Sequence, residues 1–312
     1  MKYSILIPTY KAAFLAKCID SILAQSYEDF ELIIVNDASP ENIDEIMAKY
    51  TDPRIRYYTN EKNCGAVDVV DNWNICLDYA EGDFIICMGD DDELSADCLE
   101  QYNLLMDRNS DLDIYHGRVK VIDEDSAFYS LQEARPERES VYSMMWHRMK
   151  GRTQYIGDFL YRRSALQAKS GFYKLPLAWG SDDISAYIAA QDKGIANTEK
   201  PIFYYRTNRH SITSSSNCMI KLEAIEAEQA WYTEFLAAEP TDEVDGYYAQ
   251  MMRETLNSRF AKKRVGEVAK DIKKNLCRIP YWVINRKQHK LSMGNVLFAI
   301  GAGVKNKFFG KK

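Results

Sequence analysis

The stretch Asp83-Phe-Ile-Ile-Cys-Met-Gly-Asp-Asp-Asp92 decides the fold class and locates a candidate site. Its apolar part, residues 84–88, is typical of a buried strand. Asp90, Asp91 and Asp92 follow directly, and neighbouring carboxylates repel one another. A divalent cation that also holds phosphate would relieve this repulsion, because such cations prefer oxygen ligands. A purely structural acidic turn is the alternative, and it would leave the repulsion unrelieved.

A second acidic residue ends a similar strand earlier in the chain. Asp37 follows the largely apolar residues 31–36 in the same way. The carboxyl ends of parallel strands meet at one edge of an open α/β sheet, and the ligands of such sheets bind there. We therefore expect Asp37 and the cluster at 90–92 to belong to one site.

Apolar segments of strand length alternate with segments of helical periodicity through the first half of the chain. This βαβα order predicts an α/β fold, with a Rossmann-like, mostly parallel central sheet flanked by helices. The predicted strands are 3–8, 30–36, 54–58, 83–88, 114–122, 157–162 and 202–205. The first predicted helix follows the first strand and ends at about residue 25. The other predicted helices span 40–50, 65–79, 95–108, 139–149, 164–169 and 182–193. The rest of residues 123–155 is predicted to be a connecting loop.

The last third of the chain differs in charge from the rest. From Arg259 to the end there are 15 Lys or Arg but only two acids, although the whole chain has a net charge of −6. Helical periodicity predicts a basic, helical C-terminal region at 216–312, after a domain at 1–215. A basic segment on an acidic body favours contact with an anionic surface, here the membrane, although a solvated helical face is the alternative. No apolar stretch reaches the roughly 18 residues of a spanning helix.

Other features indicate a cytoplasmic protein. The N-terminus enters a strand without the features of a signal peptide. The seven cysteines are scattered and form no Cys-x-x-Cys pair, which favours reduced thiols over disulfides or a zinc site. We expect no nucleic-acid partner, because the body is acidic and the basic tail lacks interleaved aromatic residues.

Six motifs follow one another in the first half of the chain. They are Ile5-Leu-Ile-Pro-Thr-Tyr10, Val35-Asn-Asp37, Asn63-Cys-Gly65, Asn72-Trp-Asn74, Ala80-Glu-Gly-Asp-Phe-Ile-Ile86 and Gly89-Asp-Asp-Asp92. In this order and spacing they resemble the family 2 glycosyltransferases, inverting enzymes with the GT-A fold. The resemblance covers roughly residues 1–213. It implies a donor-binding half at 1–122 and an acceptor half at 123–215.

The resemblance also implies a nucleotide-sugar site. The residues that would contact the nucleotide sugar are Pro8, Thr9, Tyr10, Asp37, Asn63, Gly65 and Asn74. Asp37 would accept hydrogen bonds from the base, expected to be uracil, whereas capping of a helix is the other explanation of this residue. Gly65 would let the backbone approach the ligand.

The metal motif of the family is usually Asp-x-Asp, and its carboxylates bind Mn²⁺ or Mg²⁺ at the donor diphosphate. Aligning the apolar residues on either side places Gly89 at the first acid, which is a departure from the family pattern. Asp91 is then the expected metal ligand, with Asp92 in support. Asp90 is expected to contact the donor sugar or ribose.

An inverting transfer needs a base that deprotonates the acceptor hydroxyl. In the family an acidic pair opens a helix, and a glycine follows about eleven residues later. Asp182 and Asp183 open a predicted helix, and Gly194 has this spacing from Asp183. The resemblance favours Asp183 as the base, with Asp182 as the alternative. Capping of the helix by Ser181 or Asp182 is the structural explanation.

The segment Tyr204-Tyr-Arg-Thr-Asn-Arg-His-Ser-Ile-Thr213 resembles a family loop that can close over the diphosphate. Arg206 and Arg209 would then bind the donor by neutralising the leaving group. A surface loop with ordinary arginines is the alternative. His210 is weak evidence for a base, and Asp158 is a further candidate acid on the acceptor side.

These features together predict a metal-dependent, inverting glycosyltransferase. It would move a sugar from a UDP-sugar to a glycan or lipid-linked acceptor in cell-surface polysaccharide biosynthesis, at the inner face of the membrane. A catalytically inactive nucleotide-binding interaction module is the alternative, and the glycine at position 89 is its only support.

Overall fold

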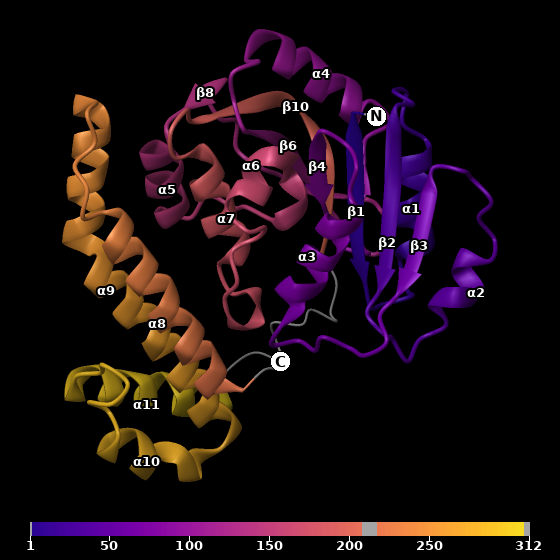
Figure 1. Ribbon diagram of the computed structural model, residues 1–312. Helices are drawn as coiled ribbons and strands as arrows, with labels where there is room; N and C mark the ends of the chain where they lie inside the picture. Colours follow the sequence, from indigo (N-terminus) through magenta and orange to yellow (C-terminus); the bar gives the residue numbers. More distant parts are fainter. Residues whose placement is uncertain (1, 208–216, 309–312) are drawn as a thin grey trace. The chain divides into compact units, whose positions relative to one another are not determined.

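The computed structural model describes residues 2–207 and 217–308, and the chain divides into two compact units (Figure 1). The first unit comprises Met1–Lys174 and Gly180–Ser211, and the second comprises Leu175–Trp179 and Ile212–Lys312.

The first unit is built on one sheet, which has ten strands in the described residues. The strands are β1 (Tyr3–Thr9), β2 (Phe30–Asn36), β3 (Ile55–Thr59), β4 (Phe84–Cys87), β5 (Glu93–Leu94), β6 (Ile114–Ile122), β7 (Phe128–Leu131), β8 (Arg138–Glu139), β9 (Phe159–Arg162) and β10 (Ile195–Arg206). Their order is β3-β2-β1-β4-β9-β6-β10-β5, with β7 beside β6 and β8 beside β10.

Parallel pairing brings the ends of the acid-tipped strands to one edge. β1 pairs in parallel with both β2 and β4, and β2 pairs in parallel with β3. Strand β9 is antiparallel to its neighbours β4 and β6, while β6 and β10 are parallel. The predicted mostly parallel central sheet flanked by helices is confirmed.

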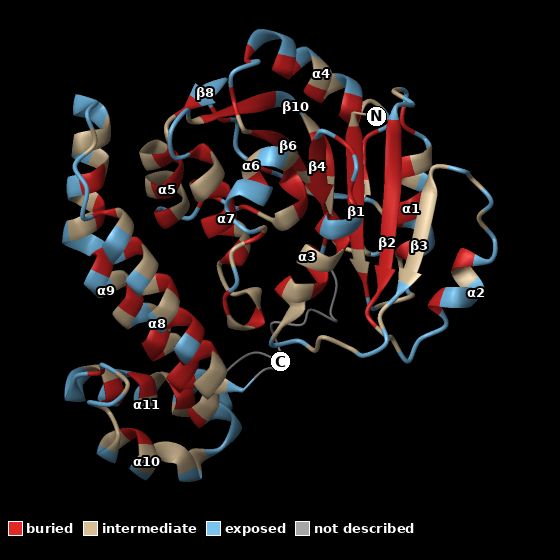
Figure 2. Ribbon diagram, viewed as in Figure 1, coloured by how far each residue is buried: buried red, intermediate tan, exposed pale blue. Residues whose placement is uncertain are grey.

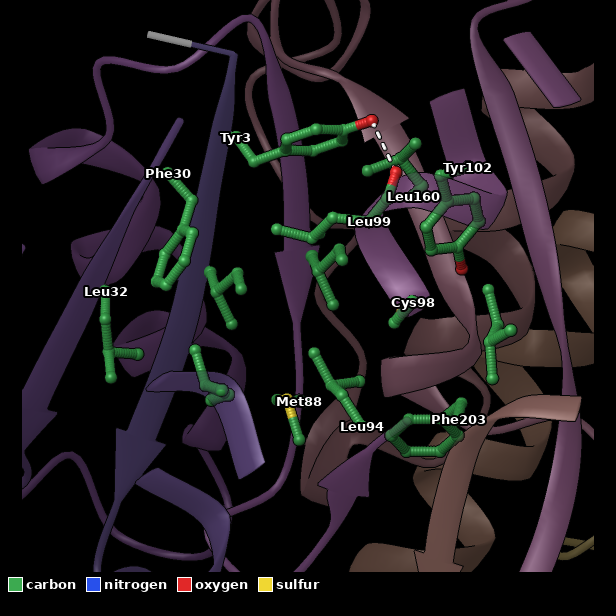
Figure 3. Close-up of a cluster of buried hydrophobic side chains, with 14 of the residues drawn as sticks. Tyr3, Phe30, Leu32, Met88, Leu94, Cys98, Leu99, Tyr102, Leu160 and Phe203 are labelled. Carbon is green, nitrogen blue, oxygen red and sulfur yellow. Dashed lines mark hydrogen bonds between the residues drawn. The ribbon is translucent and has the colours of Figure 1, made fainter. Parts of the chain in front are cut away.

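Helices cover both faces of this sheet. They are α1 (Leu15–Leu23), α2 (Ile43–Met47), α3 (Val69–Tyr79), α4 (Cys98–Arg108), α5 (Val141–Met149), α6 (Arg163–Ala168) and α7 (Ser181–Ala190). Figure 3 shows the core on one face, where side chains of β1 and β2 such as Tyr3 and Phe30 meet Leu99 and Tyr102 of α4. Helix α3 packs on β1 and β2 outside this cluster. Figure 2 shows β1 and β2 buried and β3 partly exposed.

Five elements differ clearly from the sequence expectations. Strands β5, β7 and β8 were not predicted, and β7 and β8 lie in the segment expected to be a loop. Strand β10 begins at Ile195 rather than residue 202, because a register shift on each side of Pro201 carries the strand past the proline. Helix α2 begins at Ile43, so Pro40 lies before it and not in its first turn.

The second unit is helical. Its elements are the 3₁₀ turn at Pro176–Ala178, α8 (Cys218–Phe235), α9 (Glu243–Lys274), a 3₁₀ turn at Leu276–Arg278, α10 (Ile279–Ile284) and α11 (Met293–Phe308). Helix α9 packs against both α8 and α11. None of the helices in the described ranges is long and apolar enough to cross a membrane.

Candidate functional site

The end of β1 joins the two acid-tipped strands. The backbone oxygen of Thr9 accepts a hydrogen bond of 2.9 Å from the backbone N–H of Asp37. The hydroxyl of Thr9 donates to Oδ2 of Asp90 over 3.0 Å, and the backbone N–H groups of Tyr10 and Lys11 donate to the same oxygen, each over 2.8 Å. The segment therefore links Asp37 to the acidic cluster, as the sheet topology predicts.

Asp37 is 6% exposed and sits among amides. Its Oδ1 accepts hydrogen bonds of 2.9 Å from the side chain of Asn60 and from the backbone N–H of Cys64. The side chain of Asn63 donates to the backbone oxygen of Asp37 over 2.6 Å. Helix α2 begins only at Ile43, after Asn42, so Asp37 does not cap a helix.

Gly65 has a φ of +82°, a conformation that side-chain-bearing residues rarely adopt. The turn beside Asp37 therefore favours glycine here. Asn74 has a different position from the one expected of a nucleotide contact. Its Oδ1 accepts from the backbone N–H of Phe172 over 2.8 Å, and its Nδ2 donates to the backbone oxygen of Phe172 over 3.3 Å. Asn74 therefore holds the segment around Phe172, and its placement does not support a donor contact.

The geometry of the acidic cluster explains why residue 89 is a glycine. A Cβ atom at Gly89 would lie 2.9 Å from Oδ1 of Asp91 and 3.0 Å from Oδ2 of Asp92. The two carboxylates thus converge over Gly89, in the space that a side chain there would need. Burial raises the pKa of Asp92 well above its ordinary value, and the charge of Asp91 raises it further. A cation at this point would oppose both effects.

Asp90 has a different role from Asp91 and Asp92. Its Oδ2 takes the three hydrogen bonds from residues 9–11 and so anchors the loop after β1. Burial raises the pKa of the Asp90 carboxyl, although these hydrogen bonds oppose the shift. A contact of Asp90 with the sugar remains a prediction.

Two carboxylates fit a hard cation that takes its other ligands from a diphosphate and water. Within residues 2–207 and 217–308, no three His, Cys, Asp or Glu side chains are placed to hold a metal ion by themselves. The protein would therefore supply Asp91 and Asp92, and the remaining ligands would come with the substrate. Such a site depends on the substrate for its completion.

Arg206, at the end of β10, is buried behind the acidic cluster. Its side chain is 0% exposed and pairs with Glu93. Its Nε donates to the backbone oxygen of Asp91 over 2.7 Å, and its Nη1 donates to that of Asp123 over 2.6 Å. Its backbone N–H donates to Oδ1 of Asp92 over 2.9 Å. The guanidinium therefore holds the acidic loop, and it is not exposed for contact with a diphosphate. Arg209 and His210 lie outside the described residues.

Replacing Arg206 by methionine should destabilise the first unit by about 3–5 kcal/mol, because it leaves the largely buried carboxylate of Glu93 and several carbonyl groups without their partner. Thermal unfolding followed by circular dichroism measures the effect. Arg108→Met is the matched control, because Arg108 is 61% exposed and forms only a surface ion pair with Glu137. A change of about 1 kcal/mol or less is expected there. Equal effects of the two substitutions would contradict the assignment.

The acidic pair Asp182–Asp183 lies in the first turn of α7. Gly180, at a φ of +91°, is the N-cap residue and has no side chain with which to cap the helix. Neither Ser181 nor Asp182 is therefore the N-cap residue. The carboxylate of Asp182 nevertheless accepts hydrogen bonds from the backbone N–H groups of Asp182 and Asp183 at this end of the helix. The left-handed glycine turns the chain so that the helix starts at Ser181, and no preceding side chain stands in the cap position.

Two residues from other elements hold Asp183. Arg148 of α5 donates from Nε to both carboxylate oxygens, over 3.0 and 2.9 Å. Gln154 donates to Oδ1 over 2.8 Å. Asp182 differs from Asp183 in its pKa. Burial, together with the charge of Asp183, raises the pKa of Asp182 to about 7. Arg148 and Gln154 were not predicted from the sequence, since no motif contains them.

Asp158 is fully buried beside His116, with 3.5 Å between its Oδ2 and Nε2 of the histidine. Its carboxylate accepts from the backbone N–H of Tyr155 over 3.3 Å. Burial raises its pKa well above the ordinary value. Because its side chain is 0% exposed, Asp158 is closed to a substrate and is not a good candidate for a site acid.

Tyr155 connects the acceptor side to the acidic cluster. Its ring stacks on Tyr205 with 3.8 Å between centroids. Burial raises the pKa of its phenol, and the charges that act on it include those of Arg148 and Asp92. Arg148 holds Asp183, and Asp92 belongs to the acidic cluster. The charges around both groups of acids therefore act on this aromatic residue.

Comparison with known proteins agrees with this geometry. The family model described as Glycosyl transferase family 2 matches residues 4–168, more than half of the 312-residue chain. The chain belongs to glycosyl transferase family 2. The match includes β1, β2 and β4 and the residues at their carboxyl ends, while Asp182 and Asp183 lie beyond it.

Several curated relatives are similar to this family 2 chain. The Escherichia coli protein UDP-Glc:alpha-D-GlcNAc-diphosphoundecaprenol beta-1,3-glucosyltransferase WfgD is 32% identical over 124 residues, which are 39% of this chain and 47% of the relative. The Staphylococcus aureus poly(ribitol-phosphate) beta-N-acetylglucosaminyltransferase TarS is 22% identical over 291 residues, 91% of this chain and 48% of the relative. The chain thus spans about half the length of these relatives.

Solved structures show the same fold. Residues 1–349 of S. aureus TarS in complex with UDP-GlcNAc give a TM-score of 0.71 at 17% identity, over 98% of this chain and 89% of that one. The mannosyltransferase PcManGT from Pyrobaculum calidifontis in complex with GDP-Man and Mn²⁺ gives a TM-score of 0.54 at 14% identity, over 100% and 88% of the two chains. The predicted GT-A fold is confirmed.

Proposed function

We propose that this family 2 chain is a metal-dependent, inverting glycosyltransferase. It transfers a sugar from a nucleotide sugar to a hydroxyl of a glycan or lipid-linked acceptor. The observation that carries the proposal is the link made by Thr9, which bonds to Asp37 through its backbone and to Asp90 through its hydroxyl. A site for the base and a site for the diphosphate thereby occupy one sheet edge.

Asp37 and its neighbours support a nucleobase site. A carboxylate and amides at the carboxyl edge of a sheet can accept and donate the hydrogen bonds of a uracil ring. We take Pro8, Thr9, Tyr10, Asn63 and Gly65 as the remaining contacts of the nucleotide. A UDP-sugar is the donor we propose. The name of WfgD includes UDP-Glc, and a solved structure of TarS is a complex with UDP-GlcNAc.

Asp91 and Asp92 are the proposed metal ligands, with Mn²⁺ or Mg²⁺ as the cofactor. The convergence of their carboxylate oxygens over Gly89 supports this role. When bound, the cation neutralises the charge that develops on the leaving diphosphate. Arg206 positions the loop, because its Nε donates to the backbone oxygen of Asp91 and its backbone N–H donates to the carboxylate of Asp92.

Asp183 is the proposed base, with Asp182 as the alternative. Its carboxylate removes the proton of the acceptor hydroxyl, and that oxygen forms a bond to the anomeric carbon from the side opposite the diphosphate. The bond between this carbon and the diphosphate oxygen breaks, so the configuration inverts and nucleoside diphosphate leaves. Arg148 and Gln154 hold the carboxylate in position for this step.

The acceptor belongs, in this proposal, to cell-surface polysaccharide biosynthesis at the inner face of the membrane. The printed names of WfgD and TarS refer to a diphosphoundecaprenol-linked sugar and to poly(ribitol-phosphate). The basic C-terminal region supports peripheral contact with an anionic membrane, where each Lys or Arg contributes about 1 kcal/mol.

A donor screen tests the proposal. Purified chain is incubated with UDP- and GDP-sugars and Mn²⁺, and release of nucleoside diphosphate is measured. We expect release from a UDP-sugar that stops when a chelator removes the cation and resumes when Mn²⁺ is restored. Undiminished release in chelator would refute the metal assignment. Donor binding without any release, in the presence of oligosaccharide and lipid-linked acceptors, would favour the inactive interaction module.

A further inference from the structure

Helix α11 presents an apolar face to the exterior of the second unit. Met293 is 41% exposed, Leu297 is 60% exposed and Phe308 is 63% exposed. Spacings of four and eleven residues put these three side chains on one face of the helix. Phe298, beside that face, is 72% exposed. An outward helix face is normally polar, and a contiguous exposed apolar patch marks a surface that binds something.

The opposite face of α11 is fixed to α9. Val296, Ala299 and Gly303 are buried. A Cβ atom at Gly303 would lie 2.8 Å from the backbone oxygen of Ala269 in α9. Close packing of the two backbones therefore sets the orientation of α11. Its apolar face cannot turn inward without breaking this contact.

A groove beside this face combines lysines with an apolar floor. It lies between α9 and α11 and has a volume of about 880 Å³. Val265, Ala269, Phe298 and Ala302 contribute apolar lining. The basic lining comes from Lys262, Lys270 and Lys273 of α9, which share one face of that helix because they are eight and three residues apart. One of these lysines, Lys270, also pairs with Glu267 at 2.6 Å.

Helix α9 differs from α11, because its apolar residues within 259–276 face inward. Phe260, Val268 and Ile272 of α9 are buried in the helical unit, so that segment does not lie along an interface by itself. Only its lysine face lines the groove.

We propose that α11 inserts its apolar face into an anionic phospholipid surface. Met293, Leu297, Phe298 and Phe308 enter the region between head groups and acyl chains. Lys262, Lys270 and Lys273 receive phosphate groups of the lipids in the groove. The arrangement matches an interfacial helix, in which buried apolar area and charge attraction act together. This inference deepens the membrane contact of the proposed function, and it does not depend on the transfer reaction.

Charge favours a lipid surface over a second copy of the chain. No Asp or Glu follows Asp271, so the sequence from residue 272 to the end is exclusively basic among its charged side chains. A two-fold contact between copies would bring the same surface of each copy together. The lysines of one groove would then face those of the other, and like charges at an interface oppose association.

Vesicle flotation with the full chain tests the proposal. One set of vesicles is phosphatidylcholine, and the other is phosphatidylcholine mixed with phosphatidylglycerol. The wild type should float with the anionic vesicles and be released by raised salt. The double variant Leu297→Ser/Phe298→Ser should lose about 100-fold in affinity, since two exposed side chains no longer insert. Lys262→Gln/Lys273→Gln should lose about tenfold or more, on anionic vesicles alone.

Leu104→Ser is the matched control, because Leu104 is 51% exposed on α4 in the first unit. It should bind vesicles like the wild type. Wild-type binding by the Leu297/Phe298 variant would overturn the insertion. A second result would also overturn it. In that case light scattering would show that the wild type is a dimer and that this variant is a monomer, while both bind vesicles equally. Nucleoside diphosphate release without vesicles is measured in parallel, so that a failure of lipid binding is distinguished from a failure of the transferase proposal.

Discussion

The variant Asp183→Asn should transfer sugar about 100- to 10,000-fold more slowly than the wild type, which is the usual contribution of a positioned base. Asparagine keeps the shape of the side chain, and its amide oxygen can still accept from Gln154. It cannot accept the proton of the acceptor hydroxyl. The donor should still bind, because the nucleotide site proposed at Asp37 is not altered. Single-turnover transfer and donor binding by calorimetry measure the two effects.

Asp182→Asn is the matched control for this experiment, since it changes the neighbouring carboxyl. We expect it to retain transfer within about tenfold of the wild type, a change of roughly 1.4 kcal/mol in the barrier. Burial and the charge of Asp183 raise the pKa of Asp182 to about 7. If Asp182 were the base, it would act only after losing its proton, so the wild-type rate would climb as the pH rises through about 7. Loss of transfer in Asp182→Asn, together with that rise, would move the role of base to Asp182.

Replacing Asp91 by asparagine should lower donor turnover by about 100- to 1,000-fold, an effect of the size found when one group that stabilises developing charge is removed. The amide carries no charge, and the metal would be left with one protein carboxylate, Asp92. The affinity for Mn²⁺ in the presence of UDP should fall in parallel. Nucleoside diphosphate release at increasing Mn²⁺ concentrations measures both quantities.

Asp111→Asn provides a control for the loss of one negative charge in the same unit. Asp111 is 60% exposed and pairs with Arg138 on the surface. Turnover and metal dependence should remain those of the wild type. Normal Mn²⁺ dependence in Asp91→Asn would show that the cation is held elsewhere.

The strands that carry the site were predictable because their signals are local. β2 and β6 have the predicted bounds, β1 is one residue longer at its end, and β4 is one residue shorter at each end. Each of the four is an apolar run with a clear end, so burial on the sheet follows from composition. Strands β7 and β8 lack this signal. They are short, and they pair with the stretches of β6 and β10 that β9 and β5 leave uncovered, which is tertiary information.

The partners of the site residues could not be predicted in the same way. Arg148 and Gln154 precede Asp183 by 35 and 29 residues, and no local pattern connects them with it. The burial of Arg206 also depends on distant segments, since its guanidinium bonds to chain segments more than 80 residues earlier. The acidic residues could be predicted from local spacing in the sequence. Which cationic or amide side chain each of them contacts depends on the fold.

Thr9 bonds to the residues that follow both neighbouring strands, so the sheet fixes the distance between the two acidic positions. β2, β1 and β4 are adjacent, and neighbouring strands are about 4.8 Å apart. The ends of β2 and β4 are therefore separated by roughly 10 Å, a distance set by backbone hydrogen bonding and not by flexible side chains. A ligand that touches both ends must have that reach. If the proposed donor binds here, exchanging side chains at this edge can change the preferred sugar, but the strand spacing sets the length that the nucleotide must span.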